Sequence, residues 1–153
     1  MGWIALATRC VRVEAPRELC FEVVAAAGEV VERRSDDERV VEFLSEHRGR
    51  TIRTLELVTL EAPERISYRW LKGPLPGVEE EIVFEVAEDG CTEMTYRGRF
   101  RTGDGRLRWL MGRLYVKRVF DRLVREHLDQ GKQAAEGRTA RSHVHDPCGK
   151  DAV

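Results

Sequence analysis

The sequence predicts an α+β protein in which a curved antiparallel sheet of about six to seven strands is wrapped around one long C-terminal helix. From residue 29 to residue 102 nearly every segment alternates polar and apolar residues, as strands with one buried face do. The turns between these segments are short, and short turns join neighbouring antiparallel strands. After residue 105 the apolar spacing changes to the helical period.

Length and charge limit the classes of function. A chain of 153 residues suits one domain with a substantial core. Its 26 basic and 27 acidic residues leave a net charge of −1, so bulk attraction does not favour nucleic acid or a membrane. No apolar run approaches the ~20 residues that span a bilayer. We therefore expect no nucleic-acid partner and no stable membrane insertion.

The N-terminal part predicts a strand followed by a short helix. Residues 7–15 alternate, with Val11 and Val13 on one face. Pro16 is well placed for a first helical turn, and Gly28 is a typical residue for ending the helix. Six further strands are predicted, and Asp89-Gly90 is a hairpin signal before the last of them. They cover residues 29–34, 39–47, 51–62, 65–71, 78–88 and 91–101.

The link "GPLPG" at residues 73–77 is the stiffest connection in the chain. Pro74 and Pro76 fix the backbone, while Gly73 and Gly77 permit turns. The link therefore predicts that the two strands on either side of it are held at a fixed angle to each other. A rigid connector and a lid over a binding site are both compatible with it.

Residues 106–136 predict one long helix with two apolar faces. One stripe contains Trp109, Gly112, Val116, Phe120 and their neighbours at helical spacing. Leu107, Leu110 and Leu114 lie roughly a third of a turn away. Two such faces meeting near Gly112 predict a bend, or a first half that is incompletely covered.

Residues 137–153 lack periodicity and contain few apolar residues, so we predict a disordered tail after a single domain at residues 1–136. The tail contains metal-ligand types, His143, His145, Asp146 and Cys148, but in no spacing typical of a metal site, and we predict none. The four cysteines show no CxxC spacing. We expect free thiols and a cytoplasmic location.

In their order, these segments resemble a known family. The matching stretches are "VRVEAPRELCFEV" (11–23), "LEAPERISYRW" (60–70), "GPLPGVEEEIVFEV" (73–86), "DGCTEMTYRGRF" (89–100) and the final helix. Together they resemble the START-related, Bet v 1-like helix-grip (SRPBCC) superfamily, in its polyketide cyclase/dehydrase-type branch. The resemblance implies a cavity between sheet and helix for lipids, polyketides or quinone-like molecules. The second short helix common in that family has no counterpart here, which leaves one wall of the cavity in doubt.

Strand alternation selects the candidate site residues. Side chains on one face of each strand should point toward the helix. Polar groups there need a partner or a ligand, and Arg53 with Glu80 is a candidate pair, with exposure at a strand end or edge as the alternative for both. The predicted ligand-binding residues are Arg53, Tyr68, Trp70, Glu80, Phe84, Met94 and Tyr96 from the strands, with Trp109, Val116 and Phe120 from the helix.

Three functions remain open at this stage. The first is binding of a small hydrophobic or amphipathic molecule. The second is an enzyme of cyclase or dehydratase type that acts by shape and proton transfer, and the third is an interaction protein with a vestigial cavity. We assign no catalytic residue and expect no cofactor, because no phosphate-binding or nucleophile motif is present. A homodimer is left open.

Overall fold

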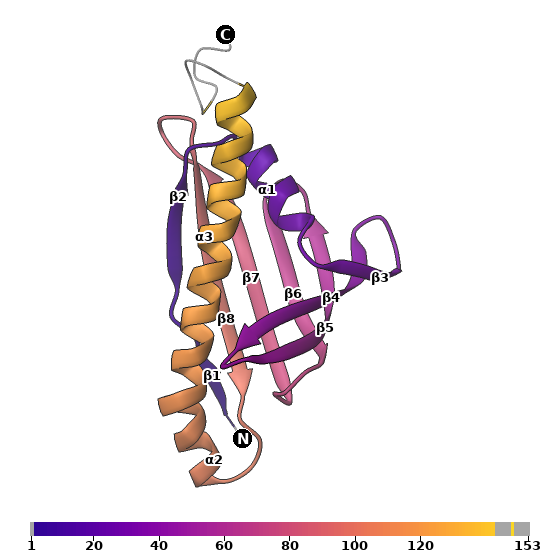
Figure 1. Ribbon diagram of the computed structural model, residues 1–153, viewed down its shortest axis with the longest axis vertical. Helices are drawn as coiled ribbons and strands as arrows, with labels where there is room; N and C mark the ends of the chain where they lie inside the picture. Colours follow the sequence, from indigo (N-terminus) through magenta and orange to yellow (C-terminus); the bar gives the residue numbers. More distant parts are fainter. Residues whose placement is uncertain (1, 143–147, 149–153) are drawn as a thin grey trace.

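The computed structural model describes residues 2–142 and residue 148. An antiparallel sheet curves beside one long helix, which confirms the predicted α+β helix-grip architecture (Figure 1). The sheet has eight strands, because Trp3–Ala5 adds a short strand that the alternation did not predict. The strands are β1 Trp3–Ala5, β2 Arg9–Val13, β3 Glu29–Arg33, β4 Glu38–His47, β5 Arg50–Glu61, β6 Arg65–Lys72, β7 Gly77–Val86 and β8 Thr92–Arg101. The helices are α1 Arg17–Ala25, α2 Arg106–Met111 and α3 Lys117–Ser142, with a π-helical segment Gly112–Val116 between the last two.

The sheet is a meander extended at one edge by the N-terminus. Its order is β1-β8-β7-β6-β5-β4-β3, and β2 also pairs with β8. Strand β8 therefore carries β1 at one end and β2 at the other. The register of β5 and β6 shifts between Leu55 and Glu56. Such bulges bend a strand and re-aim the side chains beside them.

The long helix is packed against the sheet over its second half. Its buried stripe in α3 contains Val124, Leu128, Ala135 and Thr139. The first half is different, because α2 has no buried residue and only Gly112 is buried in the π-helical segment. Gly112 allows a close approach, since a Cβ there would lie 2.2 Å from Cγ2 of Thr102. The interruption predicted near Gly112 is present as this π-helical segment, a usual cause of irregularity in helices.

Helix α1 covers the other end of the core. Its Cys20 and Phe21 are buried, and the rings of Phe21 and Phe84 lie 5.6 Å apart. The chain then enters β3 directly after residue 28, so the second short helix of the resembling family is absent between residues 26 and 37. Every residue of β3 is exposed, and this strand projects to one side (Figure 1).

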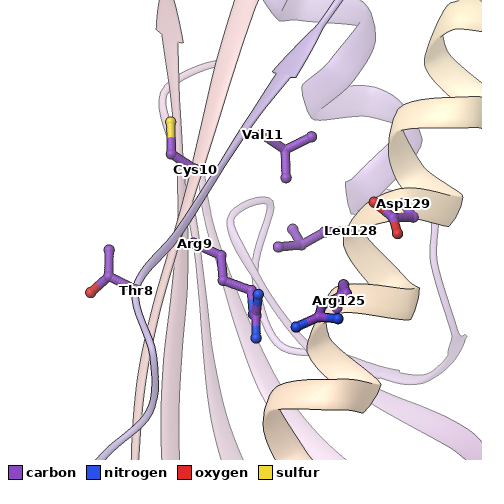
Figure 2. A pocket seen from close by; sticks show the side chains of 7 residues that line it. All are labelled: Thr8, Arg9, Cys10, Val11, Arg125, Leu128 and Asp129. Carbon is purple, nitrogen blue, oxygen red and sulfur yellow. The ribbon is translucent and has the colours of Figure 1, made fainter.

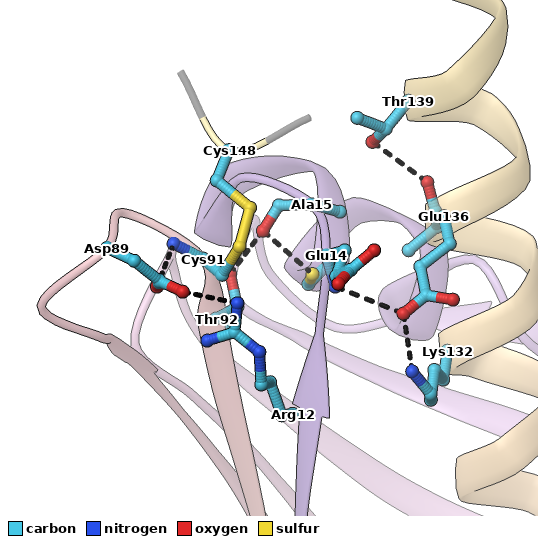
Figure 3. Close-up of a disulfide and its surroundings, with 12 residues drawn as sticks. Arg12, Glu14, Ala15, Asp89, Cys91, Thr92, Lys132, Glu136, Thr139 and Cys148 are labelled. Carbon is cyan, nitrogen blue, oxygen red and sulfur yellow. Dashed lines mark hydrogen bonds and ion pairs between the residues drawn. A yellow bond between two sulfur atoms is a disulfide. The ribbon is translucent and has the colours of Figure 1, made fainter. Parts of the chain in front are cut away.

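Two predictions about the tail and the cysteines were wrong. Helix α3 continues to Ser142, because Ala135 and Thr139 pack on its buried side and Thr139 Oγ1 donates a hydrogen bond to the Ala135 carbonyl. Cys91 and Cys148 form a disulfide, which places residue 148 against the β7–β8 turn (Figure 3). Cys10 and Cys20 are free thiols. The remainder of the tail, including His143, His145 and Asp146, lies outside the described residues.

The disulfide weakens the argument for a cytoplasmic location, which depended on four free thiols, because disulfides persist mainly in oxidising compartments. The location stays a prediction. Among the described residues, no helix combines the length and the apolarity required to cross a membrane.

Candidate functional site

The candidate site is centred on Glu80, in the middle of the inner face of the sheet. Strand alternation turns Glu79 and Glu81 to the outer face and Glu80 to the inner one. Glu80 lies directly opposite Gly98 of β8. Gly98 leaves space for the hydroxyl of Tyr96, since a Cβ at residue 98 would lie 2.5 Å from that oxygen. The Tyr96 hydroxyl donates a hydrogen bond of 2.6 Å to Oε1 of Glu80.

A second carboxyl group, Glu56, faces the same interior from β5. Its strand register places it between Val41 of β4 and Trp70 of β6. Only 6% of Glu56 is exposed, and Oγ1 of Thr54 donates a hydrogen bond of 2.7 Å to its Oε1. Among the described residues, neither Glu56 nor Glu80 forms an ion pair with a basic side chain. Glu56 is buried and Glu80 half-buried, and within the described residues the two acids lie near each other without an ion-paired cation.

Burial governs the protonation of these two carboxyl groups. It raises the pKa of Glu56 to about 8, and the nearby Glu80 carboxylate adds to that rise. Burial also raises the pKa of Glu80 above its ordinary value, while the hydrogen bond from Tyr96 opposes the rise. Like charges that share a site cannot both ionise easily. Burial therefore favours the protonated form of the pair, in which a carboxyl group can donate a hydrogen bond to a ligand.

Aromatic rings lie around Glu56 and Glu80, which we call the carboxyl pair. Tyr68 packs edge-on to Phe43, with ring centroids 6.1 Å apart. Phe120 of α3 lies 5.5 Å from Trp70 and 6.1 Å from Phe100. Burial, followed by the charges of Glu56 and Glu80, raises the pKa of Tyr68 above its ordinary value, so its phenol stays protonated. The wall is apolar, with hydroxyl groups available as donors.

The stiff link between β6 and β7 closes over Trp70. A Cβ at Gly73 would lie 2.6 Å from the Trp70 ring, so the backbone rests on the indole there. Leu75 packs against the core from the same link. The indole N–H of Trp70 is buried without a hydrogen bond of good geometry, yet it is near enough to favour the charged form of Glu80. The link therefore lies beside Trp70 and packs on the core through Leu75.

The structure brings most of the predicted site residues together. The aromatic and apolar strand residues among them pack in or against the core, as do two of the three helix residues, and Glu80 joins them through its hydrogen bond with Tyr96. Whether they bind a ligand stays a prediction. These residues are Tyr68, Trp70, Glu80, Phe84, Met94, Tyr96, Val116 and Phe120.

Two predicted residues lie elsewhere. The placement of Arg53 was wrong, because it is on the outer face with 69% of its side chain exposed, and it pairs with Glu42 at 3.5 Å. The inward positions of β5 are Thr54, Glu56 and Val58, so the pairing of Arg53 with Glu80 does not occur. Trp109 is 38% exposed in the uncovered part of the long helix. Glu56 was missed, because Leu55 and Leu57 gave the opposite face of β5 an apolar pattern in the sequence.

Two pockets open at the surface of the described residues, and the lining of the second includes Glu80 and Tyr68. One of about 370 Å³ opens between β2 and α3, where Arg9 and Arg125 point toward each other (Figure 2). The other, of about 670 Å³, is bounded mainly by charged side chains of the outer face, among them Arg97 and Arg99. Charged side chains are prominent in the lining of both. Deeper inside, the ring of Phe120 is in contact with those of Trp70 and Phe100, so aromatic side chains fill this part of the space between helix and sheet.

Comparison with known proteins identifies the fold. No family model and no curated protein matches the sequence. A protein from Thermus thermophilus superposes with a TM-score of 0.70 at 17% identity, over 86% of this chain and 95% of the other. The Zhui aromatase/cyclase from a Streptomyces species superposes with a TM-score of 0.63 at 16% identity, also over 86% and 95%.

Two further solved structures extend this comparison. A START superfamily protein from Mycobacterium smegmatis has a TM-score of 0.64 at 14% identity, over 88% of this chain and 99% of the other. The di-domain ARO/CYC StfQ from the steffimycin biosynthetic pathway has a TM-score of 0.72 at 16% identity, over 90% of this chain. This chain spans about half of that di-domain protein, with 52% covered. The chain thus has the helix-grip fold of START-related and Bet v 1-like proteins.

Proposed function

We propose that the protein binds a small hydrophobic or amphipathic molecule, such as a lipid, polyketide or quinone-like compound, between its sheet and its long helix. The observation that carries this proposal is the carboxyl pair: two acids lie in an aromatic interior without a basic partner among the described residues. Buried, uncompensated acids destabilise a fold, and perturbed groups of this kind cluster at functional sites.

The chemistry of the interior indicates the kind of ligand. Apolar rings from Trp70, Phe100 and Phe120 provide most of the contact surface. A protonated carboxyl group of the pair can donate to a carbonyl, and an ionised one can accept from a hydroxyl group. A ligand with a large apolar body and one or two oxygen atoms matches both features. Solved structures of the same fold include aromatase/cyclases, one of them from the steffimycin biosynthetic pathway.

A direct test begins with protein purified under native conditions. We expect native mass spectrometry and solvent extraction to find a co-purifying apolar compound at near-stoichiometric amount. For protein without such a compound, titration with 1-anilinonaphthalene-8-sulfonate would report an accessible apolar interior. Glu80→Gln should change the affinity for either molecule several-fold, and Glu79→Gln, on the outer face, should not. Equal behaviour of the two variants would argue against the interior site.

A second function is favoured by one specific contact. The Tyr96 hydroxyl and Glu80 lie within hydrogen-bond distance, at 2.6 Å, beside a second carboxyl group that keeps its proton. This arrangement suits proton transfer during cyclisation or dehydration of a bound chain. Incubation with a short poly-β-carbonyl thioester, with products followed by mass spectrometry, would test it. Turnover that is lost in Glu80→Gln but kept in Glu79→Gln would support the enzyme hypothesis. Absence of turnover in the parent protein would argue against catalysis on that substrate.

A further inference from the structure

The first part of the long helix presents an apolar stripe to solvent instead of to the sheet. Among the described residues, six of the eleven exposed large apolar side chains lie between Leu107 and Tyr115. Four of these, Leu107, Leu110, Met111 and Leu114, follow the i, i+3, i+4, i+7 spacing of one helix face. Their exposed fractions run from 45% to 73%. The inner side of the same segment carries Gly112 and Val116, which face the protein.

Basic residues flank this stripe on both sides. Arg108 lies about a quarter turn to one side, and Arg106, Arg113 and Lys117 lie about a quarter turn to the other. Residues 106–118 contain five cations and no acid. Since the whole chain carries −1 and this segment carries +5, the rest carries −6. The charge of the molecule is thus polarised toward the end where α2 lies (Figure 1).

A neighbouring hairpin extends the basic surface. The guanidinium group of Arg48, in the turn between β4 and β5, lies 5.6 Å from the centre of the Tyr115 ring. Arg113 lies 5.4 Å from the Trp109 ring. Aromatic rings beside guanidinium groups suit the boundary between water and acyl chains, where rings are amphipathic and long basic side chains reach the headgroups.

We propose that the stripe of Leu107, Leu110, Met111 and Leu114, with its flanking arginines, docks on the surface of an anionic lipid membrane. A helix with an apolar face bordered by basic residues lies in the plane of the interface, where apolar burial and attraction to anionic lipids act together. A second copy of this chain fits less well, because an isologous contact would place the two sets of cations against each other. The proposal does not depend on what the interior binds.

The docking surface also includes the part of the helix that covers the interior least. Helix α2 has no buried residue, and the π-helical segment separates it from α3. Insertion of the stripe into a membrane would pull on this segment next to Phe120, which packs on Trp70. If the proposed function also holds, the membrane is then the source or destination of the ligand.

Vesicle binding tests the proposal. The full chain is mixed with phosphatidylcholine vesicles, with or without phosphatidylglycerol, and bound protein is separated by flotation. We expect binding to the phosphatidylglycerol vesicles at low salt, and at least tenfold weaker binding to phosphatidylcholine alone. Leu107→Ser with Leu110→Ser, and separately Arg106→Gln with Arg108→Gln, should each weaken binding about tenfold. Circular dichroism should show that both variants stay folded.

The chain offers a matched control. Val31 and Val86 are exposed apolar residues outside the stripe, at 52% and 55%, and Val31→Ser with Val86→Ser should leave binding unchanged. Absence of binding to phosphatidylglycerol vesicles would overturn the proposal, as would equal losses in the control. Two other results would also overturn it. One is a dimer in sedimentation velocity that the leucine variant abolishes. The other is binding to poly-glutamate that is as strong as vesicle binding and is unchanged in the leucine variant.

Discussion

Three consecutive glutamates of β7 have opposite environments on the two faces of one sheet. Glu79 and Glu81 lie on the outer face, where Glu79 pairs with Arg99 at 2.6 Å and Glu81 lies 3.6 Å from Arg65 and from Arg97. Glu80, between them, lies on the inner face with a tyrosine hydroxyl as its partner. The two outer acids are in contact with water and have abundant basic neighbours.

Because the residue type is the same on both faces, the different environments of these acids determine their roles. Exposed ion pairs gain little, because water screens them and two long side chains must be ordered. A carboxyl group in the interior is held away from water, so its proton affinity rises and its removal has larger effects. The outer face therefore contributes solubility and strand register, while the inner face holds the groups suited to chemistry. Four substitutions test this contrast, beginning with the largest expected effect.

Glu56→Gln should make the stability of the protein much less dependent on pH between about 4.5 and about 8. The pKa of Glu56 is raised to about 8 in the folded protein from 4.5, so the folded state holds its proton more tightly. This group therefore lowers stability progressively as the pH rises from about 4.5 to about 8, and the loss is of order 4 kcal/mol. Urea unfolding of both proteins at pH 5 and pH 8 measures it. Parallel pH dependences in parent and variant would show that Glu56 is not held protonated.

Gly98→Ala should disturb the inner face without changing any charge. The added Cβ would lie 2.5 Å from the Tyr96 hydroxyl, so the ring must move and its bond to Glu80 is lost. We expect a loss of about 2–3 kcal/mol in the free energy of unfolding. Gly137→Ala is the control, since nothing lies within 4 Å of a Cβ there, and it should be neutral or slightly stabilising. Similar values for the two variants would contradict the close packing around Gly98.

Tyr96→Phe should remove one donor and leave the ring in place. Glu80 would lose its 2.6 Å partner, so its pKa should rise further and the protein should lose about 1–2 kcal/mol at neutral pH. Tyr115→Phe is the exposed counterpart, at 42%, and should have little effect. Denaturation at pH 5 and pH 8 should show a larger loss at the higher pH, where Glu80 is more often ionised. A loss that is the same at both values would mean that the bond does not stabilise the charged form.

Glu79→Gln should have the smallest effect of the four. It breaks an exposed pair in which about half of each side chain remains in water, at 42% for Glu79 and 52% for Arg99. We expect less than about 1 kcal/mol, and less again in high salt. Thermal denaturation at low and high salt measures both. A larger loss would remove the contrast between the two faces, because it would show that the outer pairs also determine stability.

Much of the architecture could be predicted, because periodicity records which face of an element is buried. The alternation in β6, β7 and β8 predicted that Tyr68, Glu80 and Tyr96 share the inner face. The same rule was applied to β5 with the wrong face, and Arg53 was chosen where Glu56 belongs. Leu57 is buried on the outer face and Thr54 on the inner one, so hydrophobicity alone does not distinguish the two sides of that strand.

The sequence by itself determined the order of elements, the strand faces with a clear apolar set, and the interruption of the long helix near Gly112. These depend on local spacing and on backbone properties of glycine and proline. The tertiary structure alone decided that Glu56 and Glu80 interact, that Tyr96 reaches Glu80 over Gly98, and that Cys91 meets Cys148 across 57 residues. Such pairs are separated in the chain and are joined only when the sheet curves and the helix closes on it, so no local pattern records them.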